Sequence, residues 1–127
     1  EFFHGYTYSG HPLAAAAGCA ALDVYLGEGL FDRARSMEGI FGDALHSLKG
    51  EPNVIDVRNI GLIGAVELTP IEGQPTARAI DVFRTCYDNG VIIRTTGDTL
   101  AFSPSLNIED NQIDKFIETV RAALQNN

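Results

Sequence analysis

The fold of this chain is decided by residues 54–68, which read VIDVRNIGLIGAVEL. Two short runs in this stretch, residues 54–58 and 62–68, depart from the helical period of the preceding segment and predict two neighbouring strands. Gly61 predicts a tight turn between them, and Gly64 predicts a bulge or a close backbone approach. We therefore expect a β-sheet, against which the helical segments of the chain pack.

The first helical segment precedes these strands and runs to about Leu26. Ser9 is its expected N-cap, and Pro12 is tolerated in its first turn. Small residues fill almost all of positions 14–21, which permits close approach of another backbone. The apolar residues that share one face at helical spacing are Leu13, Ala17, Ala21 and Val24.

Two further helices are predicted on either side of the strand pair. One spans about residues 30–48 and ends before Gly50 and Pro52, and the other spans about residues 76–87 and ends at Asn89. The expected stripe of the first is Leu30, Ala34, Met37, Phe41, Leu45 and Leu48, and that of the second is Ile80, Phe83 and Tyr87.

The last third of the chain predicts a hairpin and a final helix. Residues 91–94 and 99–103 are expected strands joined by a turn at 95–98. Asn107 is the expected cap of the last helix, with Asp110 three residues on. The buried stripe of that helix is Ile113, Phe116, Ile117, Val120 and Leu124. The order ααββαββα predicts an α+β fold, a small antiparallel or mixed β-sheet covered by helices, as a single domain over residues 1–127.

Composition narrows the classes of function. The net charge of −8, with nine scattered basic residues, argues against a nucleic-acid surface and against a basic membrane patch. No apolar run approaches the roughly 20 residues that span a bilayer, and no signal peptide is evident at the N-terminus. Cys19 and Cys86 have no Cys or His at ligand spacing, so we expect no metal site and two core thiols in a reducing compartment.

The densest polar cluster is the loop His4-Gly5-Tyr6-Thr7-Tyr8-Ser9-Gly10-His11-Pro12. It leads into a helix N-terminus, where free N–H groups favour an anion, and its hydroxyl groups are suited to phosphate oxygens. Ordinary helix capping by Ser9 is the alternative. His4 and His11 lack an acidic or thiol partner that would complete a metal or acid–base site.

Two arginines follow apolar strands. Arg94 is suited to a bidentate clamp on a carboxylate, and a salt bridge to Asp98 is the alternative. Arg58 fits a structural role, in which it satisfies loop carbonyl groups. The two lysines, Lys49 and Lys115, lie at a helix end and on an exposed helix face, so neither is an expected catalytic nucleophile.

Residues 4–12 closely resemble the HG(F/Y)TYSGHP segment of class III aminotransferases, and an Ala-rich helix follows in both. Residues 58–65, which read RNIGLIGA, resemble the family's second signature at the start of the small-domain sheet. Asn59, together with the strand that ends at Arg94, looks most like the β-alanine:pyruvate and ω-amine branch. The resemblance covers the whole chain.

This resemblance implies the C-terminal small domain of a fold type I transferase that uses pyridoxal phosphate. It implies that Thr7 binds the cofactor phosphate of the other subunit in a homodimer or higher oligomer and that Tyr6 neighbours that phosphate. Arg94 would bind the substrate carboxylate and swing aside for an amine that lacks one. The catalytic lysine belongs to the family's large domain, so we expect this chain to be a fragment with no catalytic residue of its own.

We therefore expect a cytoplasmic enzyme that moves an amino group from β-alanine, another ω-amino acid or an amine to pyruvate. Two alternatives remain open. One is another class III aminotransferase, of the 4-aminobutyrate or ornithine type. The other is a non-catalytic α+β module for ligand binding or dimerisation, although such a module has no need of a phosphate loop.

Overall fold

A computed structural model describes residues 5–127 of the chain. The elements follow the expected order ααββαββα, and the predicted α+β fold is confirmed. They are α1 (Pro12–Gly27), α2 (Leu30–His46), β1 (Val54–Ile60), β2 (Ile63–Leu68), α3 (Ala77–Asp88), β3 (Arg94–Thr96), β4 (Thr99–Phe102) and α4 (Asp110–Gln125).

The four strands form one antiparallel sheet in the order β1-β2-β4-β3. The β1–β2 hairpin turns through Gly61 and Leu62, since Ile60 lies opposite Ile63. Gly61 has a φ of 53°, the left-handed conformation that two-residue hairpin turns require at their first central position. The tight turn predicted from the sequence is therefore present.

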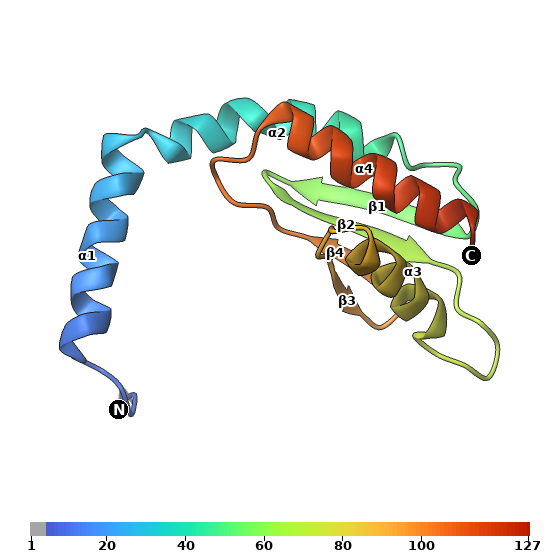
Figure 1. Cartoon of the computed structure of the whole chain (residues 1–127), viewed down its shortest axis with the longest axis horizontal. Coiled ribbons are helices and arrows are strands. Elements are labelled where there is room, and N and C mark those ends of the chain that lie inside the picture. The colour runs from blue at the N-terminus through green and yellow to red at the C-terminus, as the bar shows by residue number, and fades with distance from the viewer. Residues whose placement is uncertain (1–4) are drawn as a thin grey trace.

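Helices α2, α3 and α4 pack against one face of the sheet, and the other face is open (Figure 1). Inward-pointing residues alternate along the strands, so Val57, Val66 and Leu100 lie in one row of the core. At one end of this layer Arg121 of α4 pairs with Glu51, which also accepts a hydrogen bond from Gln125 at 3.0 Å. These bonds lower the pKa of the Glu51 carboxyl.

Two caps differ from the expected ones. The N-cap of α1 is His11 and not Ser9, because Gly10 adopts a φ of 75° and interrupts a helical path from Ser9. The Nδ1 atom of His11 accepts from the Ala14 backbone N–H at 3.4 Å. The N-cap of α4 is Glu109 and not Asn107, with a capping box in which Gln112 Oε1 accepts from the Glu109 N–H at 3.0 Å.

The buried face of α3 is offset by one residue from the predicted apolar face, Ile80, Phe83 and Tyr87. Its buried residues are Ala79, Val82 and Cys86, while Phe83 is partly buried and Tyr87 is exposed. The small side chains at Ala79 and Cys86 let the helix lie close to its neighbours. A pattern based on large residues overlooks such positions.

The third strand begins later than expected. Residues 91–93 carry Val91 and Ile93 into the core, but the paired strand starts at Arg94. Opposite them, β4 ends at Phe102, and Pro104 lacks the N–H needed to continue a ladder. The two segments separate beyond the Arg94–Ala101 pair as a result.

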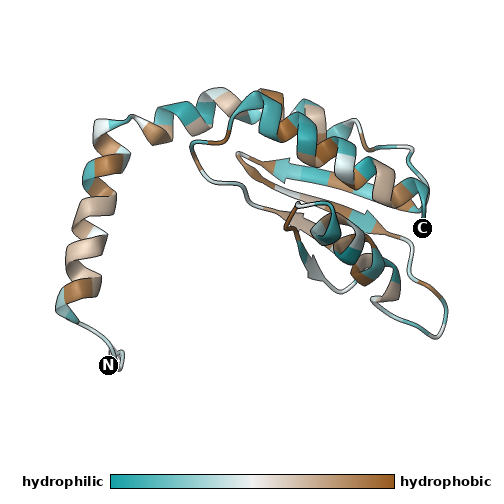
Figure 2. Cartoon of the chain, viewed as in Figure 1, coloured by the Kyte–Doolittle hydropathy of each residue, from teal (hydrophilic) through white to brown (hydrophobic). Residues whose placement is uncertain are grey.

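Helix α1 extends away from the rest of the molecule (Figure 1), and the contacts that place it within residues 5–127 are with the start of α2, where Tyr25 meets Phe31. Apolar and weakly polar residues cover most of its length (Figure 2). It has no buried residue, so the predicted inner face Leu13, Ala17, Ala21 and Val24 has no partner within residues 5–127. No single helix in the described part of the chain meets the length and hydropathy required to cross a membrane. α1 and α2 meet it only together, with a 64° bend between them.

Candidate functional site

The loop before α1 presents its side chains to solvent. Tyr6 and Thr7 are exposed, and two turns, closed by Ser9 N–H to Tyr6 O and His11 N–H to Tyr8 O, shape the loop. His4 lies outside the described residues. The loop thus offers hydroxyl groups beside a helix N-terminus, the arrangement that suits an anion.

The other end of the predicted site is Arg94, the first residue of β3. Its side chain is exposed on the open face of the sheet, and within residues 5–127 it forms no ion pair. Asp98, the alternative partner, instead accepts from the Thr76 N–H at 3.0 Å. The Arg94–Asp98 salt bridge is therefore not formed, and the guanidinium group is available to donate hydrogen bonds to an external anion.

Arg58 lies on the same open face but forms two ion pairs there. Its guanidinium donates to Asp56 Oδ2 at 2.6 Å and to Glu67 Oε2 at 2.9 Å. The bond to Arg58 lowers the pKa of Asp56, and both carboxylates raise that of Arg58. The expected structural role thus has a different basis, since the partners are carboxylates and not loop carbonyls.

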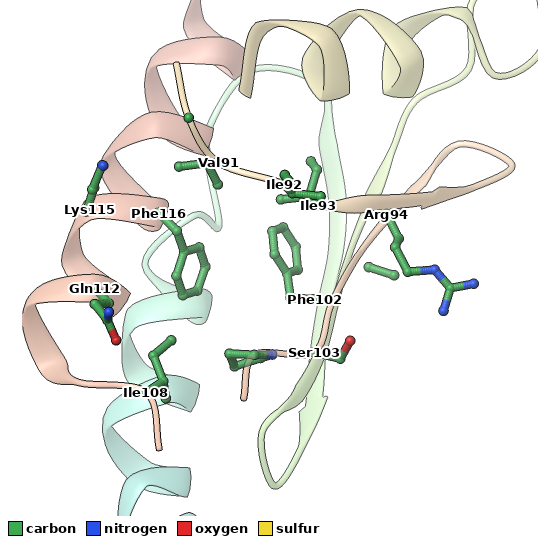
Figure 3. A pocket seen from close by; sticks show the side chains of 13 residues that line it. Val91, Ile92, Ile93, Arg94, Phe102, Ser103, Ile108, Gln112, Lys115 and Phe116 are labelled. Carbon is green, nitrogen blue, oxygen red and sulfur yellow. The ribbon is translucent and has the colours of Figure 1, made fainter. Parts of the chain in front are cut away.

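A cavity of about 450 Å³ opens where β3 and β4 separate. Its wall is mainly apolar, from Val91, Phe102, Ile108 and Phe116, with Lys115 and Gln112 at the helix side (Figure 3). Arg94 also lines the cavity, at its rim, and its side chain leads away from Phe102 and Phe116 (Figure 3). Sequence reasoning missed the cavity; the signal was Pro104, which stops β4 short of residues 91–93.

Thr7 and Arg94 are not brought together within one chain. The loop with Thr7 lies at the free end of α1, which projects away from the packed part of the chain, whereas Arg94 begins β3 within the sheet (Figure 1). The 16 residues of α1 place that loop about 24 Å from the start of α2, at 1.5 Å per residue. No single ligand of the size of an amino acid contacts both in one chain.

The lysines of the chain do not supply an enclosed amine. Lys49 and Lys115 are both exposed, although Lys115 lies at the edge of the cavity. Among residues 5–127 there is also no group of three His, Cys, Asp or Glu side chains arranged to hold a metal ion. The functional groups that the described residues present are therefore the hydroxyls of the loop and the unpaired guanidinium of Arg94.

Comparison with known proteins gives these positions a context. Residues 1–124 match the aminotransferase class-III family. The chain is 54% identical to an omega-aminotransferase of Caulobacter vibrioides and 42% identical to a beta-alanine--pyruvate aminotransferase of Pseudomonas aeruginosa. In each case the match covers 98% of this chain and 28% of the relative. The chain thus spans a little over a quarter of the length of these relatives.

Solved structures agree in fold. A transaminase with L-Ala superimposes with a TM-score of 0.86 at 35% identity, over 97% of this chain and 30% of that one. A PMP-bound aminotransferase from Vibrio fluvialis gives a TM-score of 0.86 at 31% identity, over 99% and 29%. The match along nearly the whole chain, in both sequence and fold, shows that the protein belongs to the class III aminotransferases.

Proposed function

We propose that residues 1–127 are the small domain of a longer aminotransferase, which moves an amino group from an ω-amino acid or amine to pyruvate. The names of the relatives from Caulobacter vibrioides and Pseudomonas aeruginosa support this activity. The observation that carries the substrate class is the unpaired guanidinium of Arg94 on the open face of the sheet. Both β-alanine and pyruvate have the carboxylate that such a group binds.

We propose pyridoxal phosphate as the cofactor, which supplies an electron sink for the amino-group transfer when it is bound. The residues of this chain fit its phosphate end, since Thr7 and Tyr6 bring exposed hydroxyl groups to the turn before α1. No described lysine is enclosed as a covalent anchor would be. Thr7 and Tyr6 would therefore orient the phosphate, while the remainder of the protein holds the rest of the cofactor.

The separation of Thr7 from Arg94 favours a homodimer or higher homo-oligomer. Because α1 projects from the packed part of the chain and carries the loop at its free end, the two residues would serve different sites of an assembly, with Thr7 directed to the phosphate in the other subunit. The expectation of two core thiols is confirmed for Cys86, which is buried, and is wrong for Cys19, which is exposed on α1. The cytoplasm is the proposed compartment, because its reducing conditions keep thiols free.

Arg94→Ala in the full-length enzyme tests this proposal. The change leaves the substrate carboxylate without its charged partner, which costs on the order of 2–5 kcal/mol, or roughly 30- to 4,000-fold in kcat/KM. We expect this loss in the half-reactions with β-alanine and pyruvate, measured from single-turnover cofactor spectra. The half-reaction with 1-phenylethylamine, which has no carboxylate, should be retained.

Arg94→Lys is the matched control. An ammonium group keeps the charge but does not form the bidentate fork, so we expect partial recovery with β-alanine and pyruvate. Equal loss with all three substrates, together with a lower melting temperature, would remove Arg94 from the substrate site.

A further inference from the structure

The strand that begins with Arg94, β3, is the shortest of the sheet and lies at its edge. It has three residues, and among residues 5–127 it pairs with β4 alone. An edge strand has ladder hydrogen bonds on one side only, so its backbone is held less firmly than that of a central strand. Contacts outside the ladder therefore have a large share in fixing the direction in which β3 presents Arg94.

Helix α3 packs against β3 and β4 (Figure 1) and supplies such contacts on both sides of Arg94. Near the C-terminal end of the helix, Cys86 O accepts from the Val91 N–H at 2.9 Å, three residues before Arg94. At its N-terminal end, the Thr76 N–H donates to Asp98 Oδ1 at 3.0 Å, four residues after Arg94. The segment 91–98 is thus tied to α3 at both of its ends.

The two ties differ in kind. The first is a bond between backbone atoms, and Val91 and Ile93 are also held in the core. The second depends on the side chain of Asp98, which is half-buried. The backbone carbonyl of Asp98 accepts from the Leu68 N–H at 2.9 Å, which joins the turn to β2 and not to α3. The carboxylate of Asp98 is therefore what links the turn end of β3 to the helix.

The backbone on either side of this link has a left-handed conformation. Gly97, in the turn, has a φ of 60°, and Thr76 has a φ of 70°. The first value suits a glycine in a two-residue hairpin turn, whereas the second is unfavourable for a β-branched residue. A strained residue keeps its conformation where surrounding bonds determine it, and the bond to Asp98 is one of these. The link thus fixes the turn relative to the start of α3.

We propose that Asp98 is a positioning residue for Arg94, because its carboxylate ties the β3–β4 turn to α3 and so holds β3 in the orientation that aims Arg94 at the substrate carboxylate. The inference rests on the proposed role of Arg94 with β-alanine and pyruvate. A bidentate contact between guanidinium and carboxylate depends on the relative orientation of the two planar groups. A small rotation of β3 therefore weakens substrate binding, although Asp98 does not touch the substrate.

Asp98→Ala in the full-length enzyme tests the proposal, because it removes the acceptor of the Thr76 N–H and leaves the backbone bonds of the turn in place. Each donor is measured as a single-turnover half-reaction, which gives its half-saturating concentration and its limiting rate separately. We expect the half-saturating concentration of β-alanine to rise about tenfold and its limiting rate to stay within about threefold, since the contact is present before and during the reaction. Both values for 1-phenylethylamine, which has no carboxylate, should stay within about threefold.

Asp98→Asn is the matched variant. Its amide oxygen still accepts from the Thr76 N–H, so the half-saturating concentration of β-alanine should stay within about threefold of the parent value. Val57→Ala controls for a general loss of stability, since Val57 is buried on β1, the strand furthest from β3. This change should lower the melting temperature and leave the ratio between the two donors within about threefold of the parent.

The double variant R94A/D98A shows whether Asp98 acts through Arg94. If it does, Asp98→Ala should have no further effect on β-alanine once Arg94 is alanine, which a double-mutant cycle measures. Four outcomes would each overturn the proposal: an effect that persists in the R94A background, an equal loss with both donors, no change in D98A, or a D98N variant that binds β-alanine as weakly as D98A.

The proposed function fails separately from this inference. Arg94→Ala alone tests that function, and equal effects on β-alanine and 1-phenylethylamine would reject it. Selective loss of β-alanine turnover in R94A, combined with a parental profile in D98A, would retain the function and reject the role of Asp98.

Discussion

At the scale of single residues, the two arginines of the open face differ in their partners: one is ion-paired and the other is not. Arg58 gives its hydrogen bonds to Asp56 and Glu67, which makes it part of the scaffold. Arg94 has only small or neutral neighbours on its face and no ion pair among residues 5–127. An unpaired cation on a surface is inexpensive in water, but once covered by more protein it requires an anion.

Thr7 gives a prediction at this scale. In the full-length enzyme, Thr7→Ala removes one hydroxyl bond to a charged phosphate, worth about 1.5–3 kcal/mol. We expect the cofactor dissociation constant to rise roughly 10- to 150-fold, with a smaller effect on the rate of the chemistry. Equilibrium dialysis against pyridoxal phosphate, followed by absorbance of the retained cofactor, measures this.

A mixed dimer sharpens the Thr7 test. When one subunit carries Thr7→Ala and the other lacks its catalytic lysine, the defect should appear at the site whose phosphate the altered Thr7 reaches. Thr7→Ser, which keeps the hydroxyl group, is the control and should hold the cofactor nearly as well as the parent. Retention of cofactor by Thr7→Ala through dialysis would remove the phosphate role.

At the scale of elements, regular patterns could be predicted and ends could not. The stripes of α2 and α4 were evident because large residues such as Phe41, Leu45 and Ile113 recur at helical spacing and pack in one core. The predicted start of β3 is wrong because strand pairing depends on the partner strand, and β4 ends before Pro104. The predicted N-cap of α1, Ser9, is wrong because the conformation of Gly10 decides where the helix begins.

Gly64 shows one element-level prediction that the structure confirms. The sequence predicted either a bulge or a close backbone approach at Gly64, and the structure shows a close approach of the strand to α2. A Cβ built on Gly64 would overlap Leu45 Cδ2 of α2 and lie 3.1 Å from the ring of Phe41. Both neighbours are fully buried, so neither has free space to yield into. The absence of a side chain at Gly64 therefore sets how closely α2 lies on the sheet.

We expect Gly64→Ala to destabilise the chain by about 1–3 kcal/mol, because an added methyl group overpacks the contact with α2. Denaturant unfolding followed by circular dichroism measures this as a lower midpoint. Gly39→Ala is the control, since Gly39 lies within α2 with open space around it. That change should stabilise the chain by about 0.5–1 kcal/mol through helix propensity. A neutral Gly64→Ala would show that α2 shifts freely on the sheet.

At the scale of the whole molecule, the chain divides into a packed unit and an extended helix. The packed unit is the sheet with α2, α3 and α4 on one face. Helix α1 is apolar around its circumference and has no buried residue, although an all-apolar helix is normally buried in a larger protein. The sequence predicted α1 itself, but not its lack of partners, because periodicity does not show which surface a helix meets.

The last prediction concerns residues 1–127 expressed alone. The packed unit has its own core, so we expect cooperative unfolding and slow amide hydrogen exchange in α2, α4 and the central strands. Amides of α1 should exchange fast, because the tertiary contacts of that helix are with the start of α2.

Both lysines are exposed, so mixing the isolated chain with pyridoxal phosphate should leave no protein-bound visible band after dialysis. The chain should also form no alanine from β-alanine and pyruvate. Robust turnover by the purified chain would overturn the assignment as a small domain, whereas protection of α1 equal to that of α2 would show that the isolated chain covers this helix by self-association.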